Sequence, residues 1–146
     1  MKLLFDLLSS LIALVHGQAV ANEPVVEMPK MPPYRLDKRE GETTPMVILQ
    51  SKAIKRLHIT TVKVLSSRNT PEGVRVPSSS VLYDPHGVNW MYAEEQSGSY
   101  YRIKVILRRV EAKTSLVTIV GEKILPLAIV EEGVSALYGT ESGVGK

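Results

Sequence analysis

A short turn between two apolar runs constrains the fold of this chain more than any other stretch. In the turn Asp84-Pro85-His86-Gly87, Pro stands at the second position, where its fixed φ is favourable, and Gly stands at the fourth. The flanking hydrophobic residues recur at every second position: Val81, Tyr83, Val88, Trp90 and Tyr92. Because this period is typical of half-buried antiparallel strands, residues 76–92 are predicted to form a β-hairpin at the centre of the fold.

Size and composition limit the chain to one small domain. It has 146 residues, of which 44% are hydrophobic and 23% charged, and these values are ordinary for a globular protein. It contains no cysteine, which excludes disulfides, thiolate nucleophiles and cysteine-bound zinc. The formal net charge of +3 is too small to indicate a nucleic-acid-binding protein, although it slightly favours partners with a negative surface.

The first 21 residues have the pattern of a signal peptide. A positive start at Lys2 precedes an apolar run over residues 3–15, and Ala19-Val20-Ala21 is a small-residue cleavage pattern. We expect cleavage before Asn22 and export of the remaining chain. The alternative is that this run anchors the protein in the inner membrane, although it is shorter than the ~20 apolar residues that a span requires.

Residues 22–44 are predicted to form an extended, solvated leader, because four prolines lie among charged residues and few large apolar side chains are present. Met28 and Met31 lie three residues apart in this leader. Soft sulfur ligands select Cu(I) or Ag(I), so the two methionines are a candidate metal site. Two linker methionines without a function are the other interpretation.

Further strands are predicted at residues 46–49, 59–65, 100–110, 115–120 and 124–130. Between the first two of these, Ser51 is a plausible N-cap for a short helix. Pro126 cannot donate a ladder hydrogen bond, so its strand is expected to lie at an edge or to contain a bulge.

The fold class that follows is mainly β, a small antiparallel β-barrel or sandwich of about six strands with one short helix. The domain is expected to span residues 45–138 and to include a packed piece at 134–138, followed by a flexible tail over 139–146.

The longest predicted strand, residues 100–110, has one apolar and one basic face. Its apolar face carries Tyr101, Ile103, Val105 and Leu107, and its other face carries Arg102, Lys104, Ile106 and Arg108. This alternation predicts a sheet with one buried side and one wet side.

No catalytic constellation is apparent. A hydrolase needs a nucleophile, a base and an oxyanion donor, yet Ser78-Ser79-Ser80 lacks a glycine-flanked elbow, and only His58 and His86 remain after the expected cleavage. A copper site that combines His86 with Trp90 and Met91 is disfavoured, because consecutive strand residues point to opposite faces. We predict a protein that is not an enzyme and holds no cofactor, apart from the possible Cu(I) or Ag(I) of the leader.

Three stretches carry a resemblance to a known family. VRVPSSSVLYDPHGVNWMY at 74–92, YYRIKVILRRV at 100–110 and VSALYGTE at 134–141 are similar to the C-terminal, membrane-proximal segment of periplasmic adaptor subunits, or membrane fusion proteins, of resistance-nodulation-division efflux pumps. SKAIKRLHITTVKV at 51–64 resembles the entry segment of the same family, with His58 where the family usually has glycine.

The resemblance implies a membrane-proximal domain standing alone. Full-length adaptors place a β-barrel, a lipoyl-like domain and an α-helical hairpin between the two segments, whereas here only residues 66–73 connect them. This implies a periplasmic accessory or truncated adaptor module, which docks on an inner-membrane pump or a full-length adaptor and has possible peripheral contact with the inner membrane. The candidate contact residues are Arg102, Lys104, Arg108 and Arg109.

Two alternatives to this interpretation remain open. The first is a small periplasmic Cu(I)- or Ag(I)-binding protein that uses Met28 and Met31. The second is a remnant without a present role. For the four basic contact residues, the alternative is that they are merely the wet face of a strand.

Overall fold

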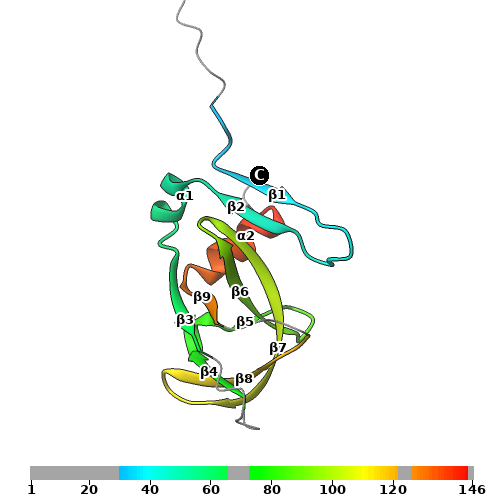
Figure 1. The fold of residues 1–146 in the computed structure, drawn as a ribbon, viewed down its shortest axis with the longest axis vertical. Helices are drawn as coiled ribbons and strands as arrows, with labels where there is room; N and C mark the ends of the chain where they lie inside the picture. Colours follow the sequence, from blue (N-terminus) through cyan, green and yellow to red (C-terminus); the bar gives the residue numbers. More distant parts are fainter. Residues whose placement is uncertain (1–29, 66–72, 122–125, 145–146) are drawn as a thin grey trace, which may run out of the picture. The chain divides into compact units, whose positions relative to one another are not determined.

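The computed structural model describes residues 30–65, 73–121 and 126–144 (Figure 1). The expected signal peptide, residues 1–21, and the leader up to residue 29, including Met28, lie outside the described residues. The elements in chain order are β1 Tyr34–Asp37, β2 Met46–Leu49, α1 Ser51–Arg56, β3 Thr60–Val64, β4 Val74–Pro77, the 3-10 helix η1 Ser78–Ser80, β5 Leu82–Tyr83, β6 Asn89–Gln96, β7 Ser99–Val110, β8 Thr114–Ile119, β9 Leu127–Glu132 and α2 Val134–Ser142.

The fold is mainly β, as predicted, and the nine strands of the described residues belong to one antiparallel sheet. The described residues form nine strands and two α-helices, where about six strands and one short helix were expected. Strand β1 lies in the supposed leader and β5 has only two residues, while α2 adds a second α-helix.

The long strand β7 organises the sheet. It pairs with β2 at its beginning, with β6 along most of its length and with β8 at its end. On the other side of β6 follow β9 and then β3, while β4 pairs with the far side of β8. The path from β3 through β9, β6, β7 and β8 to β4 curls into an open barrel, since β3 and β4 approach each other without pairing (Figure 1).

Two hydrophobic cores lie on opposite sides of β6. The barrel interior contains Met91 and Ala93 of this strand, together with Val76, Ile103, Val105, Val117 and Ile129. The second core lies outside the barrel, where Tyr92 packs with residues of β2, β7, β9, α1 and α2, among them Val47, Tyr100, Val130 and Leu137. Strand β6 is therefore buried on both faces at residues 91–93, not on one, because the side predicted to be wet carries Met91 and Ala93 into the barrel interior while the Tyr92 side packs against α2.

The predicted hairpin is present as the β5–β6 pair. The amide of Gly87 donates to the carbonyl oxygen of Asp84 at 3.0 Å, and Gly87 has a φ of 77°, in the left-handed region. The Asp84 carboxylate accepts bonds from the backbone N–H groups of His86 and Val88 at 2.8 and 2.9 Å. The local sequence thus specifies this turn through its own side chain.

Two predicted boundaries were wrong, and one strand lies elsewhere in the sheet than at an edge. Strand β1 pairs with β2, so the sheet extends into the supposed solvated leader. Helix α2 continues to Ser142 and ends at Gly143, whose φ is 72°, so the chain is not a free tail from residue 139. Strand β9 begins just after Pro126 and lies between β6 and β3, so the proline precedes the ladder and the strand is not at an edge. The strand does contain a bulge, the other expectation, but at Glu131, the extra residue between the pairs Thr60–Glu132 and Thr61–Val130.

Candidate partner-binding surface

Arg102, one of the four predicted contact residues, is held in a nearly buried ion pair. Its Nη2 lies 2.7 Å from Oε1 of Glu141, and the two side chains are 14% and 5% exposed. The guanidinium carbon also lies 4.7 Å from the ring centroid of Trp90 and 5.5 Å from that of Tyr138. Since Glu141 and Tyr138 belong to α2, Arg102 fastens this helix to the sheet and is not presented to a partner.

The same carboxylate binds a buried phenol. The hydroxyl of Tyr92 donates to Oε2 of Glu141 at 2.6 Å. Burial, followed by this hydrogen bond to a carboxylate, raises the pKa of Tyr92 far above its ordinary value. The neighbouring Trp90 donates its ring N–H to Oδ2 of Asp84 at 2.9 Å, and this bond lowers the pKa of Asp84. Arg102 contacts both Trp90 and Glu141, so these polar contacts together link the central turn, β6 and α2.

A β-bulge in β7 brings Arg108 and Arg109 to the same face of the sheet. Leu107 is opposite Val117, and Arg109 is opposite the next residue of β8, Leu116, so Arg108 is the extra residue. In a regular strand two consecutive arginines would point to opposite faces, and one of them would enter the barrel. The bulge removes this conflict, and both side chains are exposed on the outside.

The two arginines have different partners on this outer face. Nε of Arg108 donates to Oγ1 of Thr118 at 3.0 Å. Nη2 of Arg109 lies 3.3 Å from Oε1 of Glu111. The other predicted contact residue, Lys104, is exposed on the same strand, and Ile106 between them is 46% exposed.

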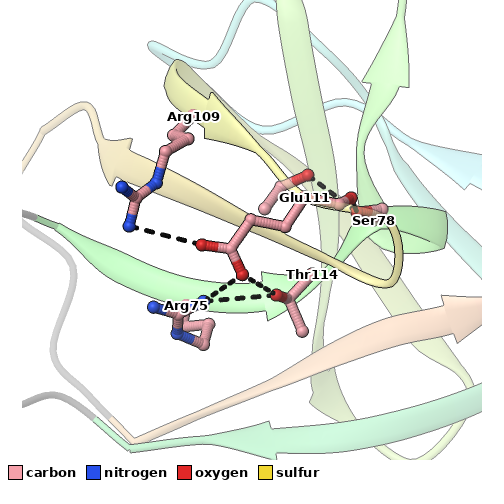
Figure 2. Close-up of polar contacts among 6 residues, drawn as sticks. Arg75, Ser78, Arg109, Glu111 and Thr114 are labelled. Atoms are coloured by element: carbon pink, nitrogen blue, oxygen red, sulfur yellow. Dashed lines mark hydrogen bonds and ion pairs between the residues drawn. The ribbon is translucent and has the colours of Figure 1, made fainter.

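Arg75, which the sequence reading did not single out, completes this group (Figure 2). Its Nη1 lies 2.7 Å from Oε2 of Glu111, and the hydroxyl of Thr114 donates to the same oxygen at 3.1 Å. The bond from Thr114 and the charge of Arg75 lower the pKa of Glu111. One exposed carboxylate is therefore shared by two guanidinium groups, Arg75 from β4 and Arg109 from β7.

The serine run supports the turn that carries Glu111. The hydroxyl of Ser78 donates to the backbone carbonyl of Glu111 at 3.2 Å and lies 2.9 Å from Oγ of Ser115, and its amide donates to the carbonyl of Lys113 at 3.0 Å. These bonds tie η1 to the β7–β8 turn. Ser78 thus acts in this arrangement as a structural residue of a turn.

We define the basic face as the exposed side chains Arg75, Lys104, Arg108, Arg109 and Lys113. Glu111 is the single acidic residue in β4, β7, β8 and the β7–β8 turn. The exposed apolar side chains Ile106, Val110 and Val120 belong to the same region of the chain. Cations interspersed with exposed aliphatic groups suit contact with a surface that carries carboxylates beside apolar atoms.

Sequence reasoning missed Arg75, Glu111 and Glu141 because their roles depend on contacts between distant segments. Arg75 and Glu111 are 36 residues apart. Arg102 and Glu141 come from a strand and a helix whose packing no local pattern predicts. The available signal was the alternation in Val74-Arg75-Val76, which places Arg75 on a wet face.

The candidate metal ligands are not gathered in the described part of the chain. Met31 is 79% exposed, and Met28 lies outside the described residues. Trp90 packs against the outer core and Met91 lies in the barrel core, so they point to opposite sides, as predicted. Within the described ranges no group of three or more His, Asp or Glu residues is placed to hold a metal ion. Metal binding by the leader stays a prediction.

Comparisons with known proteins add no relative: no family model matches the chain, and neither do any curated proteins or solved structures. Among residues 30–65, 73–121 and 126–144, no helix has the length and apolar character needed to cross a membrane.

Proposed function

We propose that this protein is a non-catalytic periplasmic adaptor module of an efflux system, which docks on an inner-membrane pump or on a full-length adaptor. The observation that carries the proposal is that the part of the chain before the short connection, which includes the stretch at 51–64, and the part after it, which includes the other three stretches, form one sheet. Strand β2 pairs with β7, and β3 pairs with β9, so residues before and after the short connection at 66–73 share one sheet. Two separate lobes would have contradicted a standalone membrane-proximal domain.

The backbone at His58 gives independent support. The resemblance places glycine at this position, and His58 has a φ of 50°, the left-handed conformation that glycine adopts without strain. It is the single non-glycine residue with a positive φ in the described part of the chain. Glycine, the residue that the resemblance places here, would adopt this backbone conformation without strain, which supports the resemblance.

The basic face is the docking surface in this proposal. Lys104, Arg108 and Arg109 remain from the predicted contact set, and Arg75 and Lys113 extend it. Arg102 leaves the set because α2 and Trp90 enclose it. A partner with carboxylates around a small apolar patch would pair with the cations and cover Ile106, 46% of whose surface is exposed.

Co-purification tests this function. The tagged chain is expressed beside a pump or adaptor encoded in neighbouring reading frames, and the retained partner is measured. The variant Lys104→Glu/Arg108→Glu/Arg109→Glu is expected to lose most of the retention. The matched control Lys52→Glu/Lys55→Glu/Lys63→Glu changes the net charge equally at exposed positions of α1 and β3 and should retain the partner. No enrichment over an unrelated periplasmic protein would refute the proposal.

A further inference from the structure

Strand β1 is an edge strand with a distinctive charge pattern. It pairs with β2, and no strand of the described residues lies on its other side. Arg35, Leu36 and Asp37 are exposed, and neither Arg35 nor Asp37 forms an ion pair within the described residues. An unpaired edge offers its N–H and C=O groups to another extended chain.

The register of β1 with β2 determines which backbone groups face outward. The amide of Gln50 donates to the carbonyl of Pro33 at 3.0 Å, which makes Pro33 opposite Gln50 a hydrogen-bonded position. Antiparallel ladders alternate, so Arg35 and Asp37 direct their N–H and C=O groups toward β2. The corresponding groups of Tyr34 and Leu36 point to the open edge.

These groups restrict how two copies of β1 could pair around a two-fold axis. Within β1 the axis can pass at Tyr34, Arg35, Leu36 or Asp37. An axis at Tyr34 places Leu36 opposite Pro32, which has no N–H to donate, and leaves both Arg35 and Asp37 opposite uncharged residues. An axis at Arg35 places two arginines opposite each other between the copies, and its pairing positions do not match the outward groups. An axis at Asp37 has the same defects with two aspartates. Only an axis at Leu36 brings the outward-facing groups of Leu36 from both copies together.

The axis at Leu36 also matches the charges. It places Arg35 of each copy opposite Asp37 of the other, twice by symmetry. Both pairs occupy non-hydrogen-bonded positions, where opposing side chains lie closest in an antiparallel ladder. Leu36, which is 38% exposed, would lie opposite Leu36 of the other copy. A shallow cavity of about 330 Å³, lined by Met31, Tyr34 and Ile48 among others, adjoins the strand.

We propose that β1 pairs with β1 of a second copy of this chain, antiparallel and centred on Leu36, to form a symmetric dimer with a continuous sheet. The contact is isologous, as closed dimers require. It is short, so the dimer is weak and depends on concentration and salt. This inference uses β1 and does not rest on the docking function of the basic face.

Sedimentation equilibrium of the purified chain at low ionic strength tests the dimer through charge reversal. R35D and D37R each place like charges opposite each other, and each should weaken self-association about tenfold or more. An equimolar mixture of the two variants restores both opposite pairs in a heterodimer, and the double variant R35D/D37R restores them in a homodimer. Recovery of association in both cases is the expected result.

Leu36→Pro provides a second measurement. It removes an outward-facing N–H and leaves the positions that bond to β2 unchanged, so it should abolish dimerisation while the far-ultraviolet circular dichroism is retained. A wild-type chain that is monomeric up to about 1 mM, or a dimer that withstands R35D and D37R, would overturn the proposal.

Discussion

Two arginine–glutamate ion pairs on β7 have the same chemistry but different roles. Near the beginning of the strand, Arg102 meets Glu141 with only 14% and 5% of the two side chains exposed. At its end, Arg109 meets Glu111 with 62% and 41% exposed. The difference comes from what covers the sheet, because the first pair lies against α2 and the second is open to solvent.

Burial changes what each pair can do. Glu141 forms an ion pair with Arg102 and accepts a hydrogen bond from Tyr92, and removal of one partner from such an enclosed group leaves the others without compensation. Glu111 contacts Arg75, Arg109 and Thr114 at the surface. Water there screens the charges and can take the place of any of these three partners. The buried pair thus holds the fold together, and the exposed pair can exchange partners.

The largest effect is expected from Glu141→Gln. The substitution leaves the nearly buried guanidinium of Arg102 without its counter-charge, so the free energy of unfolding should fall by about 2–4 kcal/mol. Urea denaturation followed by Trp90 fluorescence measures this change. A midpoint shift no larger than that of Glu111→Gln would remove the contrast between the two pairs.

Tyr92→Phe should have an intermediate effect. It removes one buried hydrogen bond to a carboxylate and should cost about 1–2 kcal/mol at neutral pH. Leu82→Val, in the same core but without a polar contact, is a control for altered packing. If Tyr92→Phe leaves the free energy of unfolding unchanged at neutral pH, the hydrogen bond from Tyr92 to Glu141 does not stabilise the fold.

The same variant should change the alkaline pH dependence. Since the folded-state pKa of Tyr92 is raised, its contribution is complete below the ordinary tyrosine pKa of about 10 and is lost as the pH rises above that value. Each such group steepens the decline by up to about 1.4 kcal/mol per pH unit. Tyr92→Phe should flatten this decline, while Tyr100, whose pKa burial raises to about 12, maintains part of it.

The smallest effect on stability is expected from Glu111→Gln. Its urea midpoint should stay within the error of repeat measurements, because the ion pairs of Glu111 are exposed. The substitution removes the single acid among the cations of the basic face, so retention of an acidic partner should increase in the co-purification. A clear loss of stability would show that Glu111 is a structural residue like Glu141.

The central hairpin and the alternation along β7 could be predicted because their causes are local. The Asp84 carboxylate bonds to the amides two and four residues later, and the period of apolar residues determines which face of a strand is buried. The mainly β fold class follows from the same repeated pattern.

The turn, most of the strands and the positions of the charged side chains could be read from the sequence alone. The tertiary structure decides which of these charged side chains a partner can reach. Helix α2 encloses Arg102, a bulge brings Arg109 out beside Arg108, and pairing with β2 turns part of a supposed leader into an edge strand. These outcomes depend on contacts between segments far apart in the chain, and such contacts leave no periodic signal in the sequence around any one residue.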